Sequence, residues 1–226
     1  MPQPIHYSYL ISFDFGPEAI LDRPQLAAHV AGISALWNEI EARTAAFLAA
    51  LLGGEAKTGI SMFFAITNDG AKRAVIDAVC SLKLKPDQNK ELQAIMKKIG
   101  ERYGERNRAI HGAWGISDLY PDALLWSDTR ETIQLQVDVA TIFKNAEAAK
   151  QLRLEFQKRI QVWKESDFKD VERRIKSQYD ELYWFTKPFI DDSLEKVGLK
   201  SARREDLPLP YSRAHPAPND DKNGQR

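Results

Sequence analysis

Apolar residues recur every three or four positions along most of this chain, and this spacing restricts the fold to one built mainly of helices. The first such pattern begins after Asp22, an acidic cap residue in this interpretation, and has Pro24 in its first turn. It ends at Gly53-Gly54. Its apolar positions are Leu26, Val30, Ile33, Leu36, Trp37, Ile40, Phe47, Leu48 and Leu51. Shorter helical patterns follow over 60–66 and 74–82.

Two further helical patterns are long. One opens at Pro86-Asp87 and stops at Gly112, and one face of it carries Leu92, Ile95, Met96, Ile99, Tyr103, Arg106 and Ile110. The other runs from Val139 through Trp163 and continues, after a break at Ser166-Asp167, to Pro188. These patterns predict a mainly α protein, an antiparallel helical bundle with an inserted β-hairpin or long loop and an extended N-terminal arm.

The non-helical segments set the expected boundaries. Aromatic and apolar residues alternate between Tyr7 and Phe15, which predicts an edge strand or an extended arm laid over the body. Residues 123–126 and 132–137 flank Ser127-Asp128-Thr129-Arg130, a pattern typical of a hairpin or a long loop. The expected organisation is an arm over 1–21, a helical core over 22–115, a hairpin or loop insertion over 116–137, C-terminal helices packing on the core over 138–199, and a disordered, proline-containing tail over 200–226.

Composition excludes some classes of protein. The chain has 32 Lys and Arg against 32 Asp and Glu, so its net charge is zero and it does not coat nucleic acid through its whole surface. Cys80 is the single cysteine, so we expect no internal disulfide and a cytoplasmic location. The longest apolar run is too short to span a bilayer, and no signal peptide is recognised, so no membrane partner is expected. No metal site is expected either, because the histidines and Cys80 lack metal-ligand spacing.

Arg106 is an unusual residue for its position. At about 100° per residue it lies roughly 40° from the centre of its helix's apolar stripe. A guanidinium stays charged, so on a core-facing surface it needs a carboxylate, a phosphate or a wet cleft. Glu39 and Glu41 in the first helix are candidate partners. Glu41, one turn from Trp37, is the expected one.

Beside that stripe runs a second line of residues: Gly100, Gly104, Asn107 and His111. Glycine inside a helix costs about 1 kcal/mol relative to alanine, so two of them need a reason. Either another helix approaches closely there, or the glycines form the floor of a groove that leads to His111. Asn107 and His111 are spaced i,i+4, so the amide is able to orient the imidazole.

Basic residues are concentrated on the same stretch. Lys97, Lys98, Arg102, Arg106 and Arg108 stand against Glu101 and Glu105, a local charge of +3. This pattern fits a patch that faces phosphate. It fits equally a solvated helix face with i,i+4 ion pairs, and both interpretations stay open.

Arg106-Asn107-x-x-x-His111 resembles the R-x4-6-H motif of the HEPN superfamily, in which a polar residue, often Asn, follows the Arg. The placement is similar too, at the end of a long helix of an antiparallel bundle, and the resemblance covers residues 24–115. It implies metal-independent RNA cleavage by a homodimer without a cofactor, in a bacterial toxin–antitoxin, stress or phage-defence system. It also implies a protein partner encoded by an adjacent gene.

The resemblance assigns roles by position. His111 would be the general acid or base, Arg106 would stabilise charge on the phosphate, and Asn107 would orient His111 or bind a phosphate oxygen. The helix pattern and the local charge add Glu41, Arg102 and Arg108 as supporting residues. Arg106 and His111 lie about 140° apart on a straight helix, so both reach one phosphate more easily if the helix end bends or if a second subunit supplies the partner group. We expect a site shared by two subunits. In HEPN toxins a Tyr often follows two residues after the His. Here that residue is Ala113, so regulation through such a Tyr is not expected.

The alternative is a non-catalytic HEPN-like binding or scaffold module. In that case the same residues form a structural lock, with Arg106 paired to a glutamate and the imidazole of His111 bonded to backbone.

Overall fold

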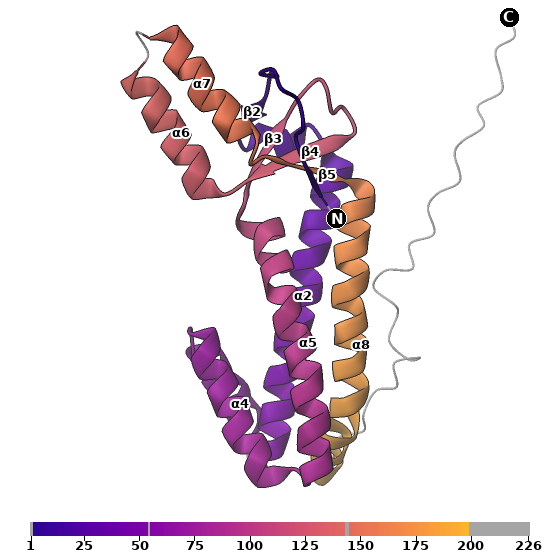
Figure 1. Ribbon diagram of the computed structural model, residues 1–226. Helices are drawn as coiled ribbons and strands as arrows, with labels where there is room; N and C mark the ends of the chain where they lie inside the picture. The colour runs from indigo at the N-terminus through magenta and orange to yellow at the C-terminus, as the bar shows by residue number, and fades with distance from the viewer. Residues whose placement is uncertain (1, 54, 143–144, 199–226) are drawn as a thin grey trace, which may run out of the picture.

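The computed structural model describes residues 2–53, 55–142 and 145–198, and it confirms a mainly α fold with a small antiparallel sheet (Figure 1). Three long helices lie side by side: α2 (Pro24–Leu52), α5 (Pro86–His111) and α8 (Glu165–Lys196). Helix α5 runs opposite to α2 and α8. The predicted tail over 200–226 lies outside the described residues.

The signals that begin and end α2 and α5 act as expected, with one exception. Helix α2 has Pro24 in its first turn and ends at Gly53, whose φ of 68° is a left-handed conformation that suits glycine. Helix α5 likewise begins at Pro86 and stops before Gly112. Asp22 is not the cap of α2, because Arg23 holds that position and no side chain caps the helix there.

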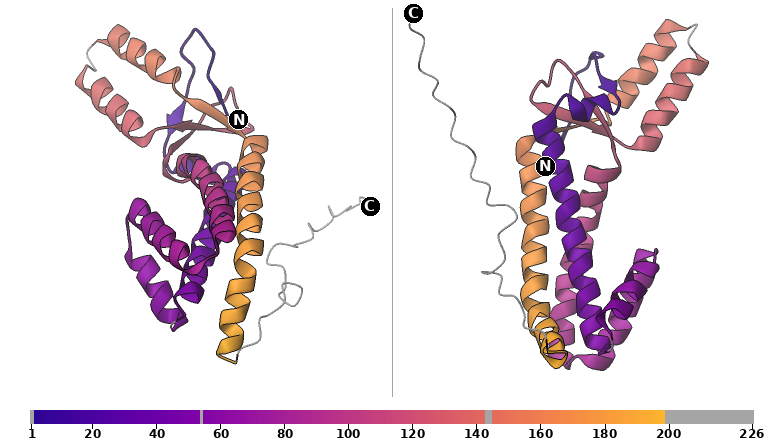
Figure 2. Two further views of the ribbon diagram at one scale, coloured as in Figure 1. Left: turned by 60° about the horizontal axis from the view of Figure 1, so that its bottom comes forward. Right: turned by 180° about the vertical axis from the view of Figure 1, so that it is seen from behind.

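Two shorter helices pack on the far end of the bundle from the sheet. Helix α3 (Ala56–Ala65) approaches α2 so closely that a Cβ on Gly59 would lie 2.7 Å from the Cα of Ala49. Helix α4 (Asp69–Lys83) buries Ile76 and Cys80 and projects from the bundle (Figure 2). Burial, and secondarily the charge of Asp77, raises the pKa of the Cys80 thiol to about 11, so the cysteine is an inert core residue.

The sheet caps the other end of the bundle. Its strand order is β1 (Gln3–Pro4), β5 (Gln161–Lys164), β4 (Ala123–Ser127), β3 (Ala113–Ile116) and β2 (Asp14–Phe15). The N-terminal arm therefore forms both edges of the sheet, as two short strands rather than one continuous strand, before the short helix α1 (Glu18–Leu21). Trp114, Trp163 and Phe168 pack together where the sheet meets the bundle, with ring centroids 5.0–5.6 Å apart.

The region after the hairpin differs from the expectation. The hairpin is β3–β4, and the predicted strand over 132–137 is instead part of helix α6 (Thr129–Thr141), because the Asp128 side chain accepts from the Arg130 N–H and caps that helix. The continuous helix expected from Val139 to Trp163 is also wrong. Helix α7 (Ala146–Gln157) is separate, and Trp163 lies in β5. Helix α8 begins at Glu165, so the expected break at Ser166-Asp167 is wrong, and it continues through Pro188 to Lys196 instead of ending at the proline.

Helices α6 and α7 form a pair that projects from the molecule. In all three ribbon views this pair and α4 extend from the same side of the bundle, with α5 between them (Figures 1 and 2). Among the described residues, no helix has both the length and the apolar composition that crossing a bilayer requires.

A buried glutamine, Gln157, holds the N-terminal arm on the body. Its side chain is fully buried, its Oε1 accepts from the Ile11 N–H at 2.8 Å, and its Nε2 donates to the carbonyl oxygens of Tyr9 and Tyr7 at 3.0 and 3.3 Å. These bonds replace ladder hydrogen bonds in the stretch of arm between β1 and β2.

Replacing Gln157 with leucine will lower the free energy of unfolding by about 2–3 kcal/mol, because each buried backbone group left without a partner costs about 1–3 kcal/mol. Urea unfolding will show a lower midpoint. Gln151→Leu, on an exposed part of α7, is the matched control and will change the stability by less than about 0.5 kcal/mol. Equal midpoints for the two variants would show that the arm does not depend on Gln157.

Candidate functional site

The Arg106–His111 segment forms the last two turns of α5, where the bundle meets the sheet. Strand β3 follows directly after Gly112, so the chain changes direction within one residue. Two carbonyl groups at this helix end are bonded by side chains from outside the helix. Trp126 Nε1 donates to the Arg108 oxygen at 2.7 Å, and Thr129 Oγ1 donates to the His111 oxygen at 2.8 Å. The helix end is therefore held by β4 and by the first residue of α6.

Arg106 brings the three motif side chains together. Its Nη1 donates to Asn107 Oδ1 at 2.8 Å and lies 3.1 Å from His111 Nε2. A guanidinium only donates hydrogen bonds, so Nε2 must be the acceptor and the ring proton resides on Nδ1 in this arrangement. The guanidinium carbon lies 5.8 Å from the centre of the Trp37 ring, and Arg106 is half-buried whereas His111 is exposed.

The prediction that Glu41 is the partner of Arg106 is wrong. Glu41 pairs instead with Lys72 of α4, with Nζ 3.3 Å from Oε1, because α4 packs against this part of α2. Among the described residues, Arg106 forms no ion pair, and its Nε is buried without a hydrogen-bond partner. The aromatic face of Trp37 takes the place of the expected carboxylate.

The expected angular separation of Arg106 and His111 does not keep their side chains apart. Their long side chains meet at 3.1 Å within one chain. A second subunit is therefore not needed to bring an imidazole beside this guanidinium.

The glycine stripe faces open space. A Cβ built on Gly100 or Gly104 would have no neighbour within 4 Å among the described residues, so the close approach of another helix of this chain is excluded. Tyr103, on an adjacent line of the helix, is 39% exposed and its hydroxyl hydrogen-bonds to Asp69 at the start of α4. The bare stripe thus leads from α4 toward Asn107 and His111.

The basic residues around the motif divide into two groups. Arg102 pairs with Glu105 three residues along α5 at 2.9 Å, and Lys98 pairs with Glu181 of α8 at 2.8 Å, so both cations are in ion pairs, but neither pair has the expected i,i+4 spacing. Arg106 and Arg108 form no ion pair within the described residues. Arg108 is exposed, and its Nε donates to the Gly104 oxygen at 3.4 Å. The guanidinium groups without a carboxylate partner are therefore those nearest His111.

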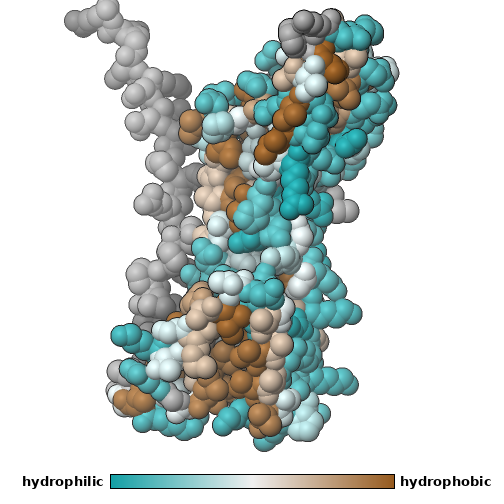
Figure 3. Space-filling model, turned by 90° about the vertical axis from the view of Figure 1, so that its left-hand side faces the viewer, coloured by the Kyte–Doolittle hydropathy of each residue, from teal (hydrophilic) through white to brown (hydrophobic). Residues whose placement is uncertain are grey.

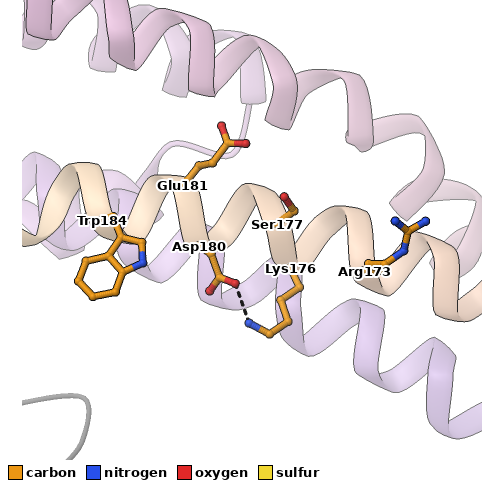
Figure 4. Close-up of a pocket in the computed structure, with 6 residues that line it drawn as sticks. All are labelled: Arg173, Lys176, Ser177, Asp180, Glu181 and Trp184. Atoms are coloured by element: carbon orange, nitrogen blue, oxygen red, sulfur yellow. Dashed lines mark hydrogen bonds and ion pairs between the residues drawn. The ribbon is translucent and has the colours of Figure 1, made fainter.

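A hollow elsewhere on the surface offers fewer groups suited to catalysis. It lies along α8 and is lined by Arg173, Lys176, Ser177, Asp180, Glu181 and Trp184 (Figure 4). Its charges neutralise one another, as in the Lys176–Asp180 pair at 2.8 Å, and it contains no motif residue. Within the described ranges, no three His, Cys, Asp or Glu side chains are placed to hold a metal ion.

Sequence reasoning did not identify three residues of this site: Trp37, Trp126 and Thr129. Trp37 was recognised only as an apolar position of its helix, whereas Trp126 and Thr129 reach the motif through contacts across 18 positions of chain. No local pattern indicates such contacts.

Comparison of the chain with protein-family profiles, with curated proteins and with solved structures finds no match.

Proposed function

We propose that this protein is a metal-independent endoribonuclease of the HEPN type. One observation carries the proposal: Arg106 Nη1 lies 3.1 Å from Nε2 of an exposed His111 and 2.8 Å from Asn107 Oδ1, and no carboxylate of the described residues pairs with the guanidinium. A permanent cation and a titratable base that share one accessible position suit a phosphodiester, which needs both charge stabilisation and proton transfer.

The reaction is an internal transfer of the phosphoryl group. His111 removes the proton from a ribose 2′-hydroxyl, the 2′-oxygen forms a bond to the adjacent phosphorus, and the bond from phosphorus to the 5′-oxygen breaks. The protonated imidazole is then able to return its proton to that oxygen, so the products are a 2′,3′-cyclic phosphate and a 5′-hydroxyl. Arg106 stabilises the charge that develops on the phosphate oxygens.

The contact between Arg106 and His111 must open for this reaction. In the free protein, the Nε2 lone pair accepts from Arg106 and is not available to a hydroxyl. A phosphate offers the guanidinium two acceptor oxygens in place of one ring nitrogen, so RNA binding would draw Arg106 onto the phosphate and free Nε2. Asn107 would then hold the guanidinium or bind a phosphate oxygen.

The alternative function is a non-catalytic binding or scaffold module. It is supported by the two hydrogen bonds from Arg106 to Asn107 and His111, which form among side chains of the protein itself. The proposed Arg–Glu part of such a lock has no counterpart among the described residues, however, and its expected member Glu41 pairs with Lys72. The exposed ring of His111 also favours the enzyme, since a lock would bury its polar groups.

The biological setting follows from the resemblance alone. We propose a cytoplasmic homodimer that belongs to a bacterial toxin–antitoxin, stress or phage-defence system and acts with a protein from an adjacent gene. A surface suited to a second copy is present on α3 and α4, where large apolar side chains are exposed (Figure 3). They are Ile60, Met62, Phe64, Val75 and Leu82.

The purified protein will cleave single-stranded RNA in the presence of EDTA, and Arg106→Lys will lower the rate about 10²-fold, because lysine donates to phosphate from one point instead of two. The assay measures cleavage of an end-labelled RNA and identifies the cyclic-phosphate product. Arg153→Lys is the matched control, since Arg153 also stacks over an aromatic ring, that of Phe13 at 5.4 Å, but lies on α7. A wild-type protein that binds RNA without cutting it would support the non-catalytic module.

A further inference from the structure

We infer that Thr129 is a positioning residue for His111, and that α6 thereby controls the geometry of the proposed nuclease site. The inference rests on the proposed function. It comes from the hydrogen bond at 2.8 Å between Thr129 Oγ1 and the backbone oxygen of His111. That carbonyl group belongs to His111 itself, whose ring is the proposed base. Fixing the backbone of His111 therefore fixes the point from which its side chain extends.

His111 needs such a tether because it is the last residue of α5. The final carbonyls of a helix have no partner within the helix, and the last turn frays unless other groups bond them. Gly112 has an extended conformation, with φ of −77° and ψ of 157°, so the chain leaves the helix directly after His111. The Thr129 hydroxyl donates to the His111 carbonyl oxygen at this end of the helix.

Thr129 is itself held in place by α6. It is the first residue of that helix, and the helix start is fixed by the Asp128 side chain, which accepts from the Arg130 N–H at 2.8 Å. One turn later, buried Thr132 donates to the Asp128 carbonyl oxygen at 3.1 Å. A well-defined helix start therefore presents the Thr129 hydroxyl to α5.

The tether joins the site to a pair of helices that projects from the body. Helices α6 and α7 pack on each other, and the end of α7 is anchored to the N-terminal arm through Gln157 (Figure 1). A displacement of this pair would pass through Thr129 to His111, because the hydroxyl at the base of α6 bonds the carbonyl of the catalytic turn. The proposed base is thus positioned from outside its own helix.

The test compares three variants in the full chain. Thr129→Val has nearly the same shape but no hydroxyl, and Thr129→Ser keeps the hydroxyl. Thr141→Val is the matched control, because Thr141 also donates to a backbone oxygen, that of Val137 at 2.8 Å, but at the opposite end of α6. Thr129 is exposed, so the valine variant is expected to fold.

Two measurements are made on each variant. Steady-state cleavage of single-stranded RNA separates kcat from KM, and nitrogen NMR of the His111 ring reports its hydrogen bonding and motion. We expect Thr129→Val to lower kcat about tenfold with KM unchanged, because a small misplacement of a catalytic group slows the chemical step more than binding. Its ring signals should shift or broaden, whereas Thr129→Ser and Thr141→Val should resemble the wild type.

An unchanged kcat and an unchanged ring spectrum in Thr129→Val would overturn the inference. So would an equal loss in Thr141→Val, which would indicate a general weakening of α6. If the wild-type protein does not cleave RNA, the proposed nuclease function fails, and the ring spectrum still decides whether Thr129 positions His111. The two failures are therefore distinguishable.

Discussion

Replacing His111 with alanine will lower the rate of RNA cleavage about 10²- to 10⁴-fold, the range expected when a general acid or base is removed. The fold will be preserved, because the His111 side chain is exposed and the hydrogen bond to Thr129 uses its backbone oxygen. The free energy of unfolding, measured by thermal denaturation, should change by no more than about 0.5 kcal/mol. His6→Ala, at an exposed position of the N-terminal arm, is the control and should cleave at the wild-type rate.

Mixing His111→Ala with Arg106→Lys tests whether the two groups act within one chain. Arg106 and His111 meet at 3.1 Å within a single chain. In a mixed dimer one chain lacks the histidine and the other lacks the arginine, so neither chain has both groups, and cleavage should not recover. Recovery on mixing would instead show that the groups act across a subunit boundary. Cleavage by His111→Ala at the wild-type rate would exclude His111 as the base.

The helices of the bundle were predictable because their signals are local. Proline in the first turn and glycine at the end mark α2, and both act within a few residues of the positions they define. Pro86 marks the start of α5 in the same way, whereas Gly112 has a φ of −77° that other residues adopt as well, and Trp126 packs on it. The proline and left-handed glycine signals depend on the conformation of the residue itself, so the sequence alone was sufficient for those boundaries.

The region after the hairpin was not predictable in this way. Alternating apolar residues over 132–137 indicate a strand, yet Asp128 caps a helix there and Ile133 and Val137 remain exposed. Trp163 continues a helical spacing that begins at Val139, but it lies in a strand that pairs with β1 and β4. Pairing between distant strands overrides local preference, and periodicity contains no record of it.

The candidate site was predictable in composition but not in its contacts. The position of Arg106 on its helix predicted a carboxylate, a phosphate or a wet cleft, whereas its neighbours are the ring of Trp37 and the side chains of Asn107 and His111. The prediction that Glu41 pairs with Arg106 was wrong because α4 packs on α2 and brings Lys72 to that carboxylate. A helical wheel also treats side chains as points, so it overestimated the separation of Arg106 and His111.

Replacing Gly112 with alanine will lower the free energy of unfolding by about 3 kcal/mol, through overpacking and the loss of one hydrogen bond. A Cβ at this position would lie 1.7 Å from Nε1 and 2.4 Å from Cδ1 of Trp126, so the indole must move. When it moves, its hydrogen bond to the Arg108 oxygen is lost. The backbone does not contribute, since the φ of −77° at Gly112 is accessible to alanine.

Gly104→Ala is the matched comparison, because the same methyl group is added inside α5, where it meets no described residue within 4 Å. This variant will raise the free energy of unfolding by about 1 kcal/mol, the usual difference between glycine and alanine inside a helix. Denaturant unfolding measures both changes, and they should have opposite signs. If Gly112→Ala is as stable as Gly104→Ala, the Trp126 indole does not hold the end of α5. If it is not, the indole packed over Gly112 keeps the helix end, and with it the proposed base, in place.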